Sequence, residues 1–144
     1  MHRVSKPLIV GIAVIFFGSI IVTEFKLYEL IPHIDKMFHV GGGFIVAWFF
    51  IRLWTDHFKS FKKFQSFIIS LSLAALVGYL WELAEYSTSL PIFTNYPIFS
   101  HYLYIGSITD TLGDLFADMF GAGLFTILRF CFKSTEENIR QLTP

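Results

Sequence analysis

Three aspartates recur at four-residue spacing in the otherwise apolar stretch "DTLGDLFADMFGAG". They are Asp110, Asp114 and Asp118. This spacing places the three carboxylates on one face of an α-helix, spread over about 12 Å at 1.5 Å per residue. Glycines and alanine share that face, while Leu, Phe, Met and Ile cover the rest. Ionisable side chains inside an apolar helix indicate metal coordination or proton transfer, so this stretch is the first candidate site.

Two further polar pairs have helical spacing. Asp35 and His39 occur in "IDKMFHVGGGF", and Glu82 and Glu85 in "GYLWELAEY". Each pair shares a helix face with a glycine, and small residues let membrane helices approach closely. Six of the eleven carboxylates in the chain belong to these three motifs. We therefore interpret the motifs as the walls of one shared pocket.

An oxygen-rich set with one imidazole suits a divalent cation such as Mg²⁺, Mn²⁺, Zn²⁺ or Ca²⁺. The candidate metal ligands are Asp35, His39, Glu82, Glu85, Asp110 and Asp114. His39 is also a candidate general base and Asp118 a deeper proton acceptor, so these two are the candidate catalytic residues. Bare carboxylates in the last two helices would cost about 10 kcal/mol in a bilayer. Lys36 is the one fixed cation close in sequence, which leaves protonation, a water-filled cavity or a bound cation to neutralise the site.

The composition predicts the elements that position these residues. Hydrophobic residues make up 54% of the 144-residue chain, and the mean hydropathy is +0.60. A span needs about 20 apolar residues, and four stretches qualify: about 7–23, 36–54, 64–86 and 106–131. The sequence therefore predicts an all-α, polytopic four-transmembrane-helix bundle that forms one domain over 1–144, with a cytoplasmic tail at 132–144. The first span resembles a signal peptide without a cleavage site, and we interpret it as an uncleaved anchor.

Positive charges predict the topology. Nine of the eleven Lys and Arg side chains precede the first span, join spans two and three, or follow span four. The positive-inside rule then places both termini in the cytoplasm of a multi-pass protein of the inner (cytoplasmic) membrane. All three polar motifs fall at the level of the outer leaflet. The basic loop "FKSFKKF" is a topology signal or a contact for anionic lipid, and a formal net charge of zero gives nucleic-acid binding no support.

Each motif also has a structural explanation. His39 could hydrogen-bond a neighbouring helix, Asp35 and Lys36 could pair at a helix start, and the two glutamates could form a polar rim. The aromatic loop "STSLPIFTNYPIFSHYLYIG" contains His101 and two prolines that break a helix. It is either an interfacial connector or a lid over the site, with His101 as a late contributor.

The three motifs, in this order on successive helices, resemble the YjdF-type family of small bacterial inner-membrane proteins and, more distantly, the VanZ-like family. The resemblance covers about residues 30–125. The family pattern of D-x-x-x-H, W-E-x-x-E and an acidic triplet before Gly corresponds to Asp35 and His39, to Trp81, Glu82 and Glu85, and to Asp110, Asp114 and Asp118. VanZ-like proteins are associated with resistance to glycopeptide antibiotics, and the YjdF-type proteins have no settled activity, so the resemblance implies a family more than a reaction.

Three functions are compatible with the sequence. The first is an outer-leaflet site that binds a divalent cation and binds or acts on a lipid-linked or cell-envelope substrate, with membrane lipids as partners. The second is a component of a proton- or cation-coupled transporter, although the inner halves of the spans offer few polar groups, so a through path would require a homo-oligomer. The third is a non-catalytic membrane interaction module. The sequence leaves open whether the protein is an enzyme.

Overall fold

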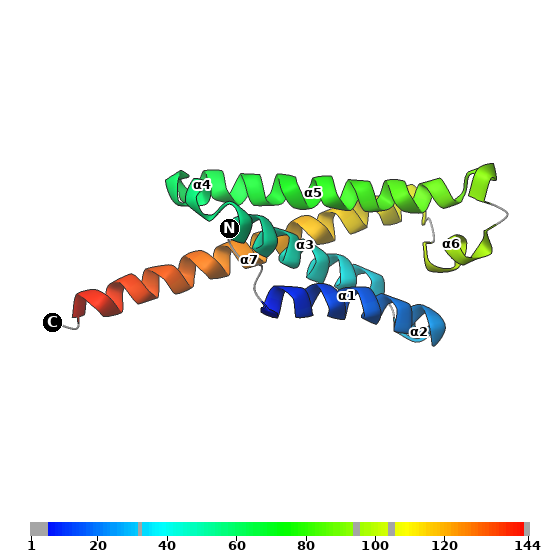
Figure 1. The fold of residues 1–144 in the computed structure, drawn as a ribbon, viewed down its shortest axis with the longest axis horizontal. Coiled ribbons are helices and arrows are strands. Elements are labelled where there is room, and N and C mark those ends of the chain that lie inside the picture. The colour runs from blue at the N-terminus through cyan, green and yellow to red at the C-terminus, as the bar shows by residue number, and fades with distance from the viewer. Residues whose placement is uncertain (1–5, 32, 94–95, 104–105, 143–144) are drawn as a thin grey trace.

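The computed structural model describes residues 6–31, 33–93, 96–103 and 106–142, with side chains described as far as Phe132 in the last helix. The described chain is all helical (Figure 1). Its elements are α1 (Lys6–Glu24), α2 (Leu27–Leu30), α3 (Ile34–Leu53), α4 (Thr55–Ser60), α5 (Lys63–Thr88), the 3₁₀ turn η1 (Pro91–Phe93), α6 (Pro97–Tyr102) and α7 (Ile108–Leu142). The helical class that the sequence predicts is confirmed.

Three helices are long and apolar enough to cross a membrane. They are α3, α5 and the first part of α7, Ile108–Phe132, and they coincide within about two residues with three of the predicted spans. The remaining predicted span corresponds to α1, whose apolar part, Leu8–Glu24, is shorter. Large apolar side chains lie exposed along these helices, as Phe16, Leu76 and Phe120 do, which suits a lipid surrounding. In Figure 1, α7 continues well beyond the end of the other helices.

The helices pack through stripes of small or polar residues at four-residue spacing. Each stripe consists of buried residues four apart on one helix: His39, Gly43, Ala47 and Ile51 in α3, Ser66, Ser70, Ala74, Gly78 and Glu82 in α5, and Asp114, Asp118, Ala122 and Thr126 in α7, where Gly121 and Gly123 beside the stripe are also buried. A four-residue repeat turns slowly around a helix with 3.6 residues per turn, so helices that meet along such stripes cross at an angle. Figure 1 shows α7 crossing α3 in this way.

Two glycines set how closely α3 and α7 approach. A Cβ atom added to Gly43 would lie 1.9 Å from the Asp118 carbonyl oxygen, and one added to Gly121 would lie 1.9 Å from the Val40 carbonyl oxygen. Backbone therefore contacts backbone at both positions. The apolar core lies next to this crossing and consists of Ala47, Ala74 and Ala122, with Val46 and Phe125 against them.

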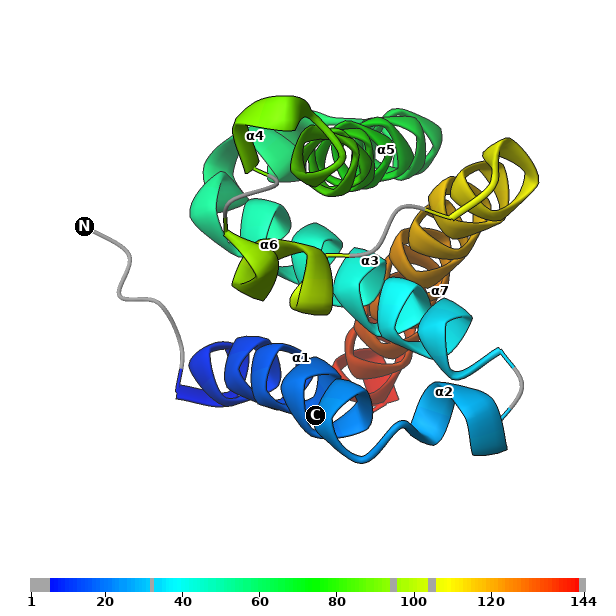
Figure 2. The ribbon, with the colours of Figure 1, turned by 90° about the vertical axis from the view of Figure 1, so that its right-hand side faces the viewer.

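The bundle has two chemically different ends. At one end α4 joins α3 to α5, and Arg52, Lys59, Lys62 and Lys63 lie there; we call this the basic end. At the other, α1 and α5 end while α3 and α7 begin, and we call this the polar end. Figure 2 shows α6 lying over the polar end between α1 and α5.

Local capping fixes where the helices begin. The Gln65 side chain accepts a hydrogen bond from the Lys62 N–H at 2.9 Å at the start of α5, and the Ser107 hydroxyl accepts one from the Asp110 N–H at 3.2 Å at the start of α7. Pro91 and Pro97 begin η1 and α6, where a missing N–H costs nothing. The break that the two prolines predict in this loop is thus observed.

Candidate functional site

An ion cluster ties the start of α3 to the start of α7. Lys36 Nζ lies 2.6 Å from Asp110 Oδ1 and 2.5 Å from Asp114 Oδ1, and it also donates to the Asp110 carbonyl oxygen at 3.1 Å. The Asp114 side chain is 5% exposed, whereas that of Asp110 is 46% exposed. One ammonium therefore neutralises part of the charge of two carboxylates. Its contribution is larger for the buried Asp114, because water can solvate the exposed Asp110.

His39 lies between two aspartates of α7. Its Nδ1 is 3.2 Å from Asp118 Oδ2, and its Nε2 is 3.6 Å from Asp114 Oδ1. All three side chains are buried. When Nδ1 is protonated, it donates a hydrogen bond to Asp118, and Nε2 on the Asp114 side keeps a free lone pair. A Cβ atom on Gly78 would lie 2.2 Å from Asp118 Oδ2, so the Asp118 carboxylate occupies space that only glycine on α5 leaves open.

Three of these residues form a group that could hold a metal ion. One potential ligand atom from each of Asp35, His39 and Asp114 lies within 4.8 Å of the other two. His39 and Asp114 are buried and Asp35 is half-buried. Two carboxylates and one imidazole are common ligands of a divalent cation, and Asp118 behind the imidazole is the usual outer partner of such a ligand.

Glu82 approaches this group from α5. Its Oε2 accepts a hydrogen bond from the Thr111 hydroxyl at 2.8 Å, while its buried Oε1 has no partner among the described residues. The side chain is 7% exposed. A buried carboxylate oxygen without a donor or cation is costly, so Oε1 is an open acceptor on α5 at the polar end.

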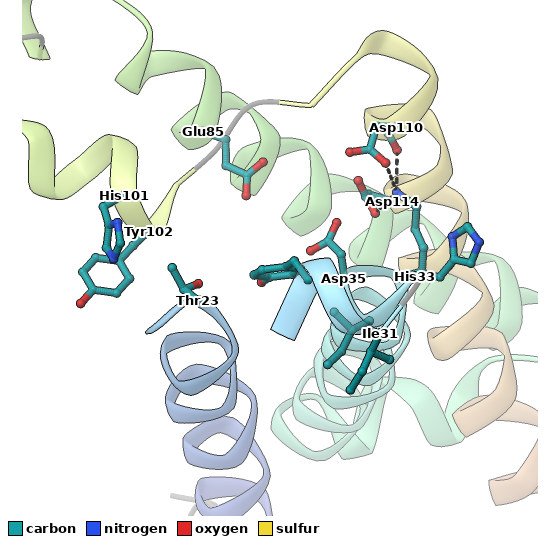
Figure 3. Close-up of a pocket in the computed structure, with 12 residues that line it drawn as sticks. Thr23, Ile31, His33, Asp35, Glu85, His101, Tyr102, Asp110 and Asp114 are labelled. Carbon is teal, nitrogen blue, oxygen red and sulfur yellow. Dashed lines mark hydrogen bonds and ion pairs between the residues drawn. The ribbon is translucent and has the colours of Figure 1, made fainter. Parts of the chain in front are cut away.

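A cavity of about 530 Å³ opens beside the group at the polar end. Its wall comes from α1, α2, α3, α5, α6 and α7 and the turn between α2 and α3. It consists of Thr23, Tyr28, Ile31, His33, Ile34, Asp35, Lys36, Glu85, His101, Tyr102, Asp110 and Asp114. Figure 3 shows the carboxylates of Glu85 and Asp35 in the space between α6, which carries His101 and Tyr102, and α7, which carries Asp110 and Asp114. The Glu85 Oε1 atom accepts a hydrogen bond from the Trp81 indole at 2.8 Å. Because Asp35 and Asp114 belong to both, the cavity and the candidate metal group are continuous.

Polar contacts between α6 and α1 border the cavity. The Tyr102 hydroxyl donates to Glu24 Oε1, and His101 Nε2 lies 3.5 Å from the same oxygen. The hydrogen bond to Glu24 raises the pKa of the Tyr102 hydroxyl, and burial, together with the charge of Asp35, raises the pKa of Tyr28. Both phenols are therefore neutral donors at physiological pH.

The structure separates the sequence-predicted site residues into three sets. Asp35, His39 and Asp114 form the compact group, and Asp118 contacts it through His39. Glu85 and Asp110 line the cavity outside the group. Glu82 is bonded to Thr111, the residue that follows Asp110 on α7. His101 also lies on the cavity wall, and Tyr104, from the same aromatic loop, lies outside the described residues.

Sequence reasoning missed several residues at this end. Thr111 contacts Glu82, and Thr23, Glu24 and Tyr28 bring the end of α1 and the turn after it to the site. Thr111 lies one 100° step from Asp110, toward α5, so a helical projection extended beyond the carboxylates could have found it. The α1 contribution had a weaker signal, namely an acid at the end of an apolar helix followed by an interfacial tyrosine.

Fold and site together define an integral membrane protein whose apolar helices carry a buried aspartate–histidine group. The chain belongs to the family described as "Predicted membrane protein (DUF2238)", whose profile matches residues 2–134. It is 25% identical over 120 residues to a protein of Thermotoga maritima described as "Uncharacterized protein"; the match covers 83% of this chain and 58% of the relative. The chain thus spans little more than half the length of that relative. No solved structure matches it.

Proposed function

We propose that this protein binds a divalent cation at the polar end and uses it to bind, or act on, a lipid-linked or cell-envelope substrate in the adjoining cavity. The observation that carries the proposal is the Asp35–His39–Asp114 group, which is continuous with the cavity. A buried set of this composition has more negative than positive charge, and a divalent cation would offset the excess.

The proposal includes a topology. Four spans, α1 included, with both termini in the cytoplasm would put the basic end inside and the polar end at the outer leaflet. The cavity would then face the envelope, and the localisation would be the inner membrane. The resemblance to YjdF-type and VanZ-like proteins supports the same assignment.

The residues would have distinct roles. Asp35, His39 and Asp114 would coordinate the cation, and Glu82 would supply a further oxygen through Oε1. Asp118 would hold the imidazole in the tautomer that leaves Nε2 free to coordinate. The cation would polarise an oxygen of the substrate and lower the pKa of a bound water. Asp110 and Glu85, which lie outside the compact group, would contact substrate in the cavity.

The direct test is metal content. Protein purified in a neutral detergent without chelator should contain close to one equivalent of a divalent metal by elemental analysis, and Asp35→Asn should lose most of it. Glu29→Gln is the matched control, because Glu29 is exposed on α2 and does not line the cavity. Folded wild-type protein that neither contains a divalent metal nor gains thermal stability from added Mn²⁺ or Zn²⁺ would exclude the cation site.

The structure argues against the transport function, and the metal experiment distinguishes the proposed cation site from a non-catalytic module. The apolar group of Ala47, Ala74 and Ala122 lies between the polar end and the buried serines of α5, which argues against a proton or cation path through one copy. A non-catalytic module, with the polar residues serving only to hold helices together, predicts the absence of a metal effect and a loss of stability when the carboxylates are neutralised.

A further inference from the structure

We propose that the cavity at the polar end binds a protonated amine, presented by a lipid head group at this depth in the membrane. The inference rests on the proposed function only in treating the cavity as the substrate site. It names the chemical class of the ligand, which the candidate metal group alone does not.

The wall of the cavity has more acidic than basic side chains. Asp35, Glu85, Asp110 and Asp114 face the cavity, and Lys36 is the fixed cation among the lining residues, with its ammonium already bonded to two of the aspartates. His33 and His101 also line the wall. With all four carboxylates ionised and both imidazoles neutral, one divalent ion would still leave the wall negative. An anionic head group would meet net repulsion, whereas a cation would be attracted.

The unpaired carboxylate oxygen of Glu82 is a second, independent observation. Glu82 Oε1 is buried without a partner among the described residues, while its Oε2 accepts a hydrogen bond from Thr111, the residue next to the cavity-lining Asp110. The unpaired Glu82 oxygen is thus one more acceptor in this region that has neither a hydrogen-bond donor nor a cation. The excess of acceptors therefore extends from the wall into the bundle.

The remaining lining suits an amphiphile. Tyr28 and Tyr102 offer aromatic rings to an ammonium group, and Ile31 and Ile34 supply apolar contact. On the outside of α5, near the same end, Tyr79, Trp81 and Tyr86 are exposed, a pattern typical of the head-group layer. A volume of about 530 Å³ fits a small head group and lies within the usual range of ligand sites.

The test compares two lipids that differ in the amine. Full-length protein in neutral detergent with a chelator is titrated with dihexanoyl phosphatidylethanolamine or with dihexanoyl phosphatidylglycerol, and thermal unfolding is followed by tryptophan fluorescence. We expect a dose-dependent rise in Tm with the amine lipid and none with phosphatidylglycerol. Equal effects of the two lipids, or a larger effect of phosphatidylglycerol, would overturn the proposal.

Two further arms make the test specific. Glu85→Gln should weaken the apparent affinity for phosphatidylethanolamine about fivefold, whereas Glu29→Gln, with the same loss of charge, should leave it unchanged; equal affinities would contradict the assignment of the cavity. Free ethanolamine as effective as the lipid would support amine binding from a soluble source, and a requirement for at least 100-fold more would support the lipid source. Since metal is chelated throughout, failure here leaves the proposed cation site standing, and the reverse holds.

Discussion

At the scale of single residues, the polar end has more carboxylates than cations. The three motifs contribute six acids, the ammonium of Lys36 and the imidazole of His39, and these two basic groups contact different pairs of aspartates. Lys36 bonds Asp110 and Asp114, while His39 lies between Asp114 and Asp118. Asp114 thus contacts both basic groups, and it is the residue that the ion cluster and the candidate metal group have in common.

Replacing Lys36 by Met should destabilise the metal-free protein. The change leaves the buried Asp114 without its ammonium, and we expect a loss of about 1–3 kcal/mol in the free energy of unfolding, less than for a fully buried pair because Asp110 is partly exposed. Asp110→Asn in the same chain should recover part of the loss by removing the repulsion between the two carboxylates. Denaturant unfolding in mixed micelles measures both, and a double variant no more stable than Lys36→Met would contradict the charge argument.

Asp118→Asn should weaken metal binding more than it weakens the fold. Asparagine has the same size and fits the space that Gly78 leaves, but it no longer favours the proton on His39 Nδ1. Loss of such an outer partner typically costs about 10- to 100-fold in metal affinity. A Mn²⁺ titration followed by calorimetry should show this shift with a nearly unchanged Tm; unchanged affinity would assign Asp118 a purely structural role.

The grouping of these residues at one end of the bundle could be predicted from the sequence, but their pairing could not. Spacing and residue type selected seven polar residues that the structure places at the polar end, because charge in an apolar helix is conspicuous. Which oxygen meets Lys36, and that His39 lies between two aspartates of α7, depends on the rotation of α3 against α7. That rotation follows from contacts between distant parts of the chain, which a helical projection of one segment does not contain.

At the scale of helices, long apolar runs predicted the long elements closely. The short helices α2, α4 and α6 were not predicted, since segments of four to six residues are too brief for a 3.6-residue pattern to repeat. Their omission matters for the site, because α2 and α6 contribute Tyr28, His101 and Tyr102 to the cavity.

The run Gly41–Gly42–Gly43 provides a matched test of the helix crossing. Alanine raises helix propensity at each position, but a Cβ atom at Gly43 would meet the Asp118 carbonyl oxygen at 1.9 Å, whereas one at Gly42 would lie 3.7 Å from the nearest atom, Asp118 Oδ1. Gly43→Ala should therefore separate α3 from α7 and lower Tm by more than about 10 °C or prevent folding. Gly42→Ala should fold normally. Equal tolerance of the two changes would show that the backbones of α3 and α7 do not approach as closely at Gly43 as the structure indicates.

At the scale of the whole molecule, the bundle is polar at one end, apolar in the middle and basic at the other end. The alanine core lets α3, α5 and α7 approach closely in the middle of the bundle. Helix α6 lies over the polar end and contributes His101 and Tyr102 to the cavity wall. The proposed topology follows from this asymmetry by the positive-inside rule, and it would let the cavity meet an envelope substrate on the outer side of the membrane.

Cysteine accessibility tests the orientation directly. In a Cys131→Ser background, Glu29→Cys on α2 reports the polar end and Lys59→Cys on α4 reports the basic end; both positions are exposed. A membrane-impermeant maleimide should label Glu29→Cys in intact cells and label Lys59→Cys only after the cells are permeabilised. The reverse pattern would place the cavity in the cytoplasm, where a lipid-linked envelope substrate would have to be bound before export. Labelling of both positions in intact cells would show that the spans between them do not traverse the membrane as proposed.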